Sequence, residues 1–480
     1  MSMIKTTLPA RRTRRVVVFV LLLLLPAGCQ SYHDKPLTPE AVARALQTPS
    51  WRELRVAVNR TSSEQLPKTM LSPSSGITPN SAAALALILN PSLRAIRNLH
   101  GEASAQLLQA GILTNPALTG SFGYITGGFR TDTFNPYGIG VNWNIRQLID
   151  RQARISAAHY KLRQVDLEVA WREWQTAEAA RLAVYAIAAA RQQLHEALFA
   201  RRELDKTYKL ARRAGKQGMI TLYNLGAALN ASRRADALVL TSRQKLVLSQ
   251  LRLARAMGLG PRTAFILSPS VRLPTAVHLP NVAKLEHSVE NRRLDLLALH
   301  MGYESQQAQL RAAVLRQFPG VAIGFSQSSD ANNVHSTSFG VSIELPIFDR
   351  NQGQIALTKA SRREIYDDYM ARVFDARSDI GIAAANIRSL EEQIRQAQIA
   401  VGKYSTLANR DLRGLQAKAI NIGAFAATTE QLERERILLV RLQYQLVKNL
   451  IALELSSGDG FLNLTGGPAT GAFRNKGDLR

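Results

Sequence analysis

Two stretches of the chain alternate strictly between apolar residues and small or polar residues. In residues 338–345, SFGVSIEL, the apolar positions are Phe339, Val341, Ile343 and Leu345. In residues 138–145, GIGVNWNI, they are Ile139, Val141, Trp143 and Ile145. A period of two places the apolar side chains on one face of a strand and the others on the opposite face. Each stretch therefore predicts a β-strand, and Pro346 predicts the end of the second strand because it has no N–H for the ladder.

After each of these strands, the apolar positions recur every three or four residues, which is typical of an amphipathic helix. No Pro or Gly occurs between Gly140 and Gly215, so residues 148–214 predict one uninterrupted helix. At about 1.5 Å per residue, this helix extends for roughly 100 Å, and it has to pack against other long helices. Residues 222–257 predict the return helix of a hairpin. The second half predicts a long helix ending near residue 416 and a return helix through residue 453.

The second half of the chain repeats the order of the first. Each long helix is preceded by a β-hairpin, predicted at residues 116–146 and 319–345, and by a shorter helix, predicted at residues 81–111 and 285–317. The sequence LIDR at residues 148–151 returns as IFDR at residues 347–350, which is 199 positions later. We interpret this as a tandem duplication. The predicted divisions are 81–276 for the first repeat, 277–457 for the second and 458–480 for a flexible C-terminal tail.

Four strands in one chain are too few to close a barrel, for which about eight is the usual minimum. Their alternation is nevertheless typical of a membrane barrel with a wet lumen. Open sheet edges are not tolerated in lipid, so several copies have to combine. We therefore expect a mostly α protein with a membrane β-barrel part: a trimeric 12-stranded β-barrel, with four strands per chain, continued by a long α-helical barrel. The alternative from these patterns is a water-soluble coiled-coil protein that carries the strands at one end.

Residues 1–28 predict a signal peptide, with four arginines before an apolar run at residues 16–25. Cys29 is the single cysteine, which excludes an intrachain disulfide. Ala27-Gly28-Cys29 resembles the end of a bacterial lipobox, although Pro26 stands where that motif has an aliphatic residue. The resemblance implies that Cys29 is lipidated and anchors an N-terminal arm, residues 29–80, in the outer membrane. The alternative is an ordinary signal peptide with an incidental cysteine.

The net charge is +25, from 61 basic and 36 acidic residues. A balance of this kind first suggests an anionic partner such as nucleic acid. The basic residues are spread along the helical segments, however, and no zinc spacing or RNA-binding aromatic motif accompanies them, so we expect no nucleic-acid binding. The chain contains no GxxxxGK, HExxH or GxSxG motif, and its eight histidines lack metal-ligand spacing. We expect no enzymatic activity, no cofactor and no bound metal.

Three stretches, in this order and spacing, resemble TolC-type outer-membrane efflux channels. They are residues 90–93 (NPSL), 110–118 (AGILTNPAL) and 345–355 (LPIFDRNQGQI), and the resemblance covers residues 81–455. The last stretch is most similar to the cation (heavy-metal) efflux branch. The resemblance implies a homotrimer in the outer membrane that extends into the periplasm. Its implied partners are a periplasmic adaptor protein and an inner-membrane pump of the resistance-nodulation-division type.

The function implied by this resemblance is that of a passive exit channel for metal cations or small toxic compounds. One alternative is the outer-membrane duct of a type I protein secretion system. An alternative of a different class is a periplasmic coiled-coil structural protein.

The family's hairpin tips, which the adaptor grips, carry a glycine and a hydroxyl- or Asn-containing turn. Gly218, Thr221 and Leu222 match this pattern at the first tip. At the second tip the glycine is replaced near residues 418–419, which leaves Ile420 and Asn421 as the candidate contacts.

Charged residues just before the second tip are candidates for a gate. By the same resemblance, Arg410, Asp411 and Arg413 would narrow the periplasmic aperture. The alternative is that they are solvated helix charges.

Overall fold

The structure is a computed structural model, and it describes residues 30–47, 50, 52–53, 56, 76–128, 134–263, 265–416 and 422–460. The chain divides into two compact units, Met1–Pro49 and Ser50–Arg480. The first unit contains the short helix α2 (Pro39–Ala45), which begins at Thr38, where the side-chain oxygen accepts a hydrogen bond from the N–H of Ala41. The predicted signal peptide and Cys29 lie outside the described residues.

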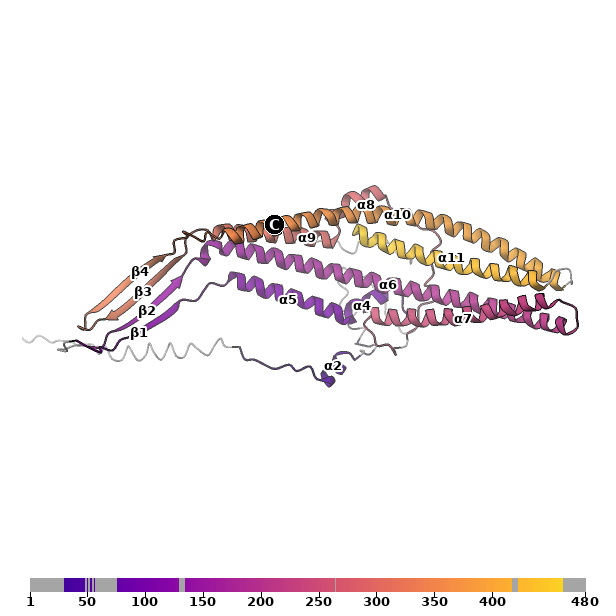
Figure 1. The fold of residues 1–480 in the computed structure, drawn as a ribbon, viewed down its shortest axis with the longest axis horizontal. Helices are drawn as coiled ribbons and strands as arrows, with labels where there is room; N and C mark the ends of the chain where they lie inside the picture. The colour runs from indigo at the N-terminus through magenta and orange to yellow at the C-terminus, as the bar shows by residue number, and fades with distance from the viewer. Residues whose placement is uncertain are drawn as a thin grey trace, which may run out of the picture. The chain divides into compact units, whose positions relative to one another are not determined.

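The second unit contains the repeated order that the sequence predicts: shorter helices, a β-hairpin, a long helix and a return helix (Figure 1). The elements of the first repeat are α4 (Pro79–Leu89), α5 (Pro91–Gly111), β1 (Ala117–Phe122), β2 (Tyr137–Asn144), α6 (Gln147–Lys216) and α7 (Leu222–Ala256). Those of the second are α8 (Val282–Ser288), η1 (Val289–Asn291), α9 (Leu294–Leu315), β3 (Val321–Ser329), β4 (His335–Ile343), α10 (Gln352–Gln416) and α11 (Ile422–Ser457).

The four strands form one antiparallel sheet in the order β1-β2-β3-β4. The register places apolar residues opposite one another across the sheet, as in the row Leu118, Val141, Phe325 and Phe339. The predicted period of two is therefore confirmed. The predicted bounds of the last strand, 339–345, are wrong, because β4 begins at His335 and ends at Ile343. It begins earlier because the Asp330 carboxylate accepts hydrogen bonds from two backbone N–H groups of the preceding turn, which leaves His335 opposite Ser329.

The helix that the sequence predicts at residues 81–111 is divided in the structure into α4 and α5, which meet at Asn90. Asn90 ends α4 and caps α5, with its side-chain oxygen accepting a hydrogen bond from the N–H of Ser92. Pro91 occupies the first position of α5, where a missing N–H costs nothing. The chain can therefore change direction between α4 and α5 without leaving backbone groups unsatisfied.

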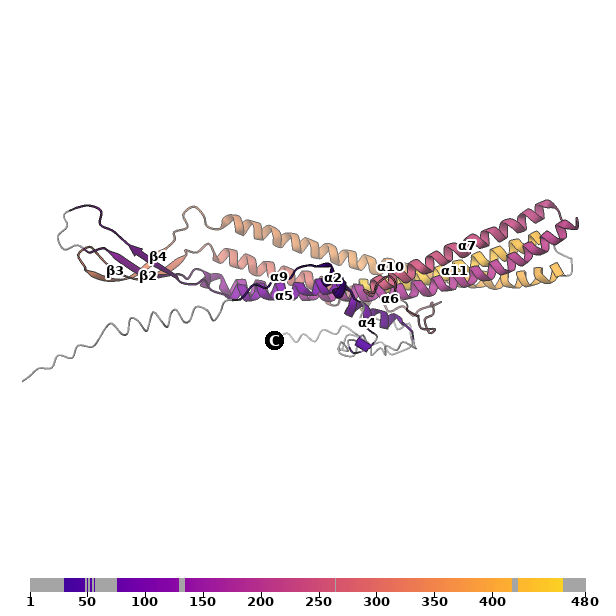
Figure 2. The same cartoon turned by 90° about the horizontal axis from the view of Figure 1, so that it is seen from below.

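The long helices α6 and α10 have 70 and 65 residues, and other helices lie alongside them (Figure 2). One apolar core joins α4, α6 and α7 through side chains such as Leu85, Val184 and Leu253. A second joins α8, α9, α10 and α11 through side chains such as Leu296, Ile387 and Leu446. Many of the remaining buried residues are alanines, which allow helices to approach closely. Within the described residues, no helix is apolar over enough of its length to cross a membrane.

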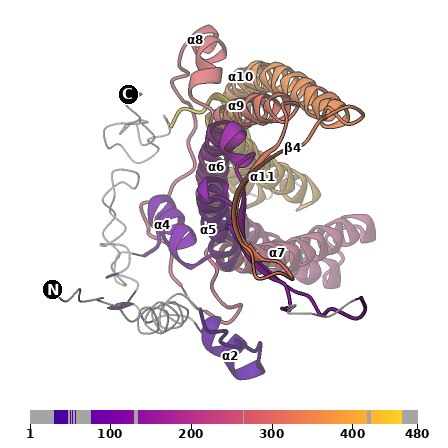
Figure 3. The ribbon, with the colours of Figure 1, turned by 90° about the vertical axis from the view of Figure 1, so that its left-hand side faces the viewer.

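Within the second unit, α5, α6, α9 and α10 follow one another side by side next to the sheet (Figure 1). Seen along their length, these helices and the sheet form an arc, and α4 and α8 lie on its convex side (Figure 3). The concave side is therefore the side that other copies of the chain could enclose.

Candidate functional site

The sheet carries one apolar face that the chain itself leaves uncovered. Phe325 on β3 is 57% exposed and Phe339 on β4 is 71% exposed, although they lie opposite one another within the sheet. The other exposed apolar residues of the strands are Leu118 and Phe122 on β1, Tyr137, Ile139 and Val141 on β2, and Val341 and Ile343 on β4. A continuous apolar surface of this kind marks a contact with lipid or protein.

The opposite face of the same strands is small and polar. Its residues are Thr119, Ser121, Gly138, Gly140, Asn142, Ala322, Gly324, Ser326, Ser328, Ser336, Ser338, Gly340 and Ser342. No Lys, Arg, Asp or Glu occurs in any of the four strands. Among the described residues, the outer strands β1 and β4 each pair with one strand, so the sheet has two open edges. Such edges have to be paired before the sheet can lie in lipid.

A network of charged side chains joins the strands to the helices below them. The Arg146 guanidinium bonds the Glu344 carboxylate at 3.0 Å and also donates to the carbonyl oxygen of Arg316 at 2.8 Å. The buried Asp150 carboxylate accepts hydrogen bonds from both Arg154, at 3.1 Å, and Arg316, at 2.6 Å. These bonds fasten the first repeat to the second. Sequence reasoning used Asp150 only as a landmark of the duplication and did not assign it this contact.

The first hairpin tip is a tight turn that presents apolar side chains. Gly218 has a positive φ of 68°, a conformation that glycine adopts without strain. The hydroxyl of Thr221 caps α7 by accepting a hydrogen bond from the N–H of Asn224 at 3.3 Å. Leu222 and Tyr223 are 86% and 83% exposed. Of the three residues predicted at this tip, Gly218 and Thr221 shape the turn, and Leu222 is available to a partner. The sequence analysis did not include Tyr223 among the contacts, although an aromatic residue beside a turn could have indicated a contact there.

Comparisons with known proteins agree with this geometry. Residues 285–459 match the family model described as outer membrane efflux protein. No curated protein matches the chain. Among solved structures, CusC superimposes with a TM-score of 0.67 at 17% identity, covering 90% of this chain and 99% of that one. The outer membrane protein VceC from Vibrio cholerae gives 0.66 at 18% identity, covering 80% and 97%, and the outer-membrane channel OprN gives 0.69 at 14% identity, covering 90% and 99%.

The chain has the fold of the outer-membrane efflux channels. The resemblance drawn from its three sequence stretches is thereby confirmed, as is the expected combination of a four-stranded antiparallel sheet with a long helical part. The matched family consists of channels, not enzymes, as the sequence predicts. Identities of 14–18% establish the fold, and cargo and partners have to be argued from this chain's own residues.

The three residues predicted to narrow a periplasmic aperture differ from one another in burial. Asp411 is 8% exposed, and its carboxylate accepts a hydrogen bond from the Thr428 hydroxyl at 2.6 Å, so it ties α10 to α11. Arg410 and Arg413 are exposed to solvent. Ile420 and Asn421, the candidates at the second tip, lie outside the described residues. Among the residues that the structure does describe, no group of three or more His, Cys, Asp or Glu could hold a metal ion.

A buried carboxyl lies where α11 packs against α6. Glu433 is 5% exposed, and one of its oxygens has no hydrogen-bond partner among the described residues. The nearby Arg436 bonds Glu196 instead, at 3.2 Å, and lies over the ring of Phe199. Burial raises the pKa of Glu433 to about 7, with Glu196 adding to the increase and Arg436 opposing it. This carboxyl therefore changes charge near neutral pH.

Proposed function

We propose that the chain is the outer-membrane exit duct of a tripartite efflux pump. Three copies would join their sheets into one barrel of twelve strands and their helices into one tube. The observation that carries this proposal is the four-stranded sheet, with an uncovered apolar face and two open edges. Lipid would cover the apolar face, and neighbouring copies would pair the edges.

The polar face of the sheet would then line a water-filled passage. Its side chains are hydroxyls, amides and glycines, which neither fill the lumen nor hold an ion tightly. A conduit of this kind releases cargo as readily as it admits it. The energy for transport would come from an inner-membrane pump of the resistance-nodulation-division type.

A periplasmic adaptor protein would contact the hairpin tips. At the first tip, Leu222 and Tyr223 stand out from a turn that Gly218 and Thr221 hold in shape. Exposed apolar side chains on a rigid turn are suitable anchors for a partner because they lose little conformational freedom on binding. At the second tip, Ile420 and Asn421 are proposed contacts, and Arg410, Asp411 and Arg413 would influence the width of the opening. Cys29, once lipidated, would anchor the arm at residues 29–80 to the outer membrane.

Deletion of the gene, followed by exposure to a panel of metals and toxic organic compounds, tests the proposed function. We expect the deletion strain to become sensitive to some members of the panel and the intact gene to restore resistance. Unchanged resistance, together with a lost secreted protein, would contradict the efflux assignment and favour a secretion duct.

The adaptor contact is tested by the double variant Leu222→Glu and Tyr223→Glu. We expect it to form trimers but to fail to restore resistance, because two carboxylates would replace the apolar anchors. The control is Ile266→Glu, which changes another highly exposed aliphatic side chain, 71% exposed and far from the tip along the chain, and should restore resistance. Full resistance with the tip variant would contradict the proposed contact.

A further inference from the structure

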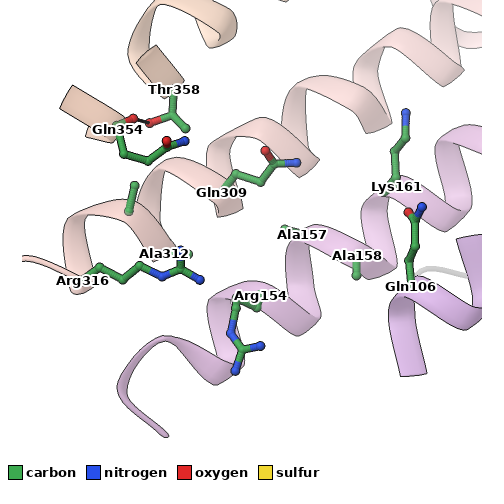
Figure 4. Close-up of a pocket in the computed structure, with 11 residues that line it drawn as sticks. Gln106, Arg154, Ala157, Ala158, Lys161, Gln309, Ala312, Arg316, Gln354 and Thr358 are labelled. Carbon is green, nitrogen blue, oxygen red and sulfur yellow. Dashed lines mark hydrogen bonds between the residues drawn. The ribbon is translucent and has the colours of Figure 1, made fainter. Parts of the chain in front are cut away.

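A groove below the sheet collects basic side chains from helices of both repeats. It has a volume of about 300 Å³ and runs across α5, α6, α9 and α10 (Figure 4). Its charged and amide residues are Arg154, Lys161, Arg316, Gln106, Gln309 and Gln354. The rest of its lining consists of alanines and one threonine, so the wall contains three cations and no carboxylate.

The positive charge of the groove is only partly compensated. Two of the three cations, Arg154 and Arg316, share the buried carboxylate of Asp150. Each guanidinium carries five N–H donors, so both retain donors after these bonds. Lys161 donates to the neutral amide oxygen of Gln164 at 3.1 Å. The lining therefore has three positive charges, two of which share one buried negative charge, and an anion in the groove could accept hydrogen bonds from two preoriented guanidiniums.

The charges in the rest of the chain do not cancel the positive charge of the groove. The strands contribute no charged side chain, and at the junction Arg146 and Glu344 neutralise each other. Residues 1–29 account for five of the basic residues, and residues 461–480 carry a net charge of +2, so residues 30–460 keep a net charge of +18. The groove and the chain as a whole are therefore both positively charged.

The groove belongs to the concave side of the arc. Figure 3 shows that the arc of helices opens toward the side from which Figure 1 is drawn, and Figure 4 shows α10, α9 and α6 in the same order and direction as Figure 1. In the proposed duct, the concave side faces the passage. Arg154, Lys161 and Arg316 would then meet cargo directly below the uncharged barrel.

We propose that this groove binds anions and that the duct prefers anionic cargo carrying carboxylate, phosphate or similar oxyanion groups. The inference rests on the proposed function, because it requires the concave side to enclose the passage. Guanidinium groups match the planar, two-oxygen geometry of such anions. Three copies of the chain would place three grooves around one lumen. The same charges repel metal cations, so of the two cargo classes that the sequence analysis named, the structure favours small toxic compounds, specifically anionic ones.

Ion selectivity of the purified protein in planar bilayers tests the proposal. Dilute KCl on one side and concentrated KCl on the other give a reversal potential whose sign reports whether chloride or potassium permeates more readily. We expect a chloride preference that is largest in dilute salt, because the field of fixed charges reaches only about 10 Å at 0.1 M salt. Potassium citrate should reduce the current carried by KCl, because citrate would occupy the groove.

The informative variant is Arg154→Gln combined with Lys161→Gln, which removes two of the three cations while Arg316 continues to pair with Asp150. We expect the permeability ratio of chloride to potassium to fall by about two-fold or more in dilute salt, where the lost charges are least screened. Citrate inhibition should weaken in parallel. The matched control is Lys284→Gln, which removes an exposed cation from α8, on the convex side, and should change neither property.

The outcomes separate the two proposals. A protein that forms no conducting channels would refute the duct itself. Conducting channels that prefer potassium, or a chloride preference that the double variant leaves unchanged, would refute only the anion site. Failure of the double variant to form trimers, while the control forms them, would assign these cations a structural role in folding or assembly and would also refute the site.

Discussion

The carboxyl of Glu433 predicts a pH-dependent stability whose size can be worked out from its surroundings. Its pKa is about 7 in the folded chain, compared with an ordinary value of 4.5. The main cause is burial between α6 and α11, and the carboxylate of Glu196 adds to it. Arg436, the nearest cation, is engaged with Glu196 and offsets only part of the increase.

The sign of the effect follows from proton binding. Between pH 4.5 and about pH 7 the folded chain holds a proton on Glu433 that the unfolded chain has lost. Stability therefore decreases as the pH rises through this window and stays constant above it. At about 1.4 kcal/mol per pH unit over this window, the loss is at most about 3–4 kcal/mol per chain. This value is an upper limit, because solvent near the carboxyl screens part of the interaction.

The perturbation is Glu433→Gln, which keeps the shape of the side chain but cannot ionise. We expect the melting midpoint of the wild-type protein in detergent to fall from about pH 5 to about pH 8, and that of the variant to fall much less, so that the variant is the more stable protein at the higher pH. The control is Glu392→Gln, which removes an exposed carboxyl from α10 and should leave the wild-type pH dependence intact.

An infrared measurement provides a second readout. Protonated Glu433 should give a carboxylic C=O band at acidic pH that disappears near pH 7 and is absent from the variant. A wild-type midpoint that does not change with pH, or a variant that keeps the full wild-type slope, would refute the reasoning.

Three further predictions concern the anchor, the aperture and the middle of the fold. Cys29→Ala should abolish metabolic labelling with a fatty acid, and continued labelling would exclude lipidation at this position. Substituting Asp411 and Arg413 by Ala should raise the conductance of the trimer in planar bilayers, and an unchanged conductance would remove both from the gate. Gly258→Ala should lower the free energy of unfolding, measured by thermal unfolding, by about 1–3 kcal/mol, because Gly258 has a φ of 73° and an added Cβ would lie 2.7 Å from a backbone oxygen. The control Gly101→Ala, with open space around it, should not lower the free energy of unfolding.

The elements that could be predicted from the sequence are those with a strong local pattern. The period of two in residues 138–144 and 339–343 fixed which side chains share a face of the sheet, and the absence of Pro and Gly after Gly140 fixed the length of α6. The order of elements within each repeat followed from the internal duplication. Strand ends were less accurate, because the start of β4 depends on hydrogen bonds to Asp330 that no periodicity reveals.

Contacts between distant residues could not be predicted from one sequence. Asp150 and Arg316 are 166 positions apart, and only the packing of α6 against α9 brings them together. Asp411 was expected either to line the aperture or to be solvated, but its environment is set by Thr428 on the facing helix. The basic groove has the same origin, because its cations come from α6 and α9, in different repeats.

The most direct test of the whole account is the mass of the purified complex, measured in detergent and again after detergent removal. The account predicts three copies of the chain that stay dissolved only while detergent covers the apolar face of the sheet. A single chain that remains dissolved and folded in plain buffer would contradict it, because such a chain would have covered that face and both edges of the sheet by itself.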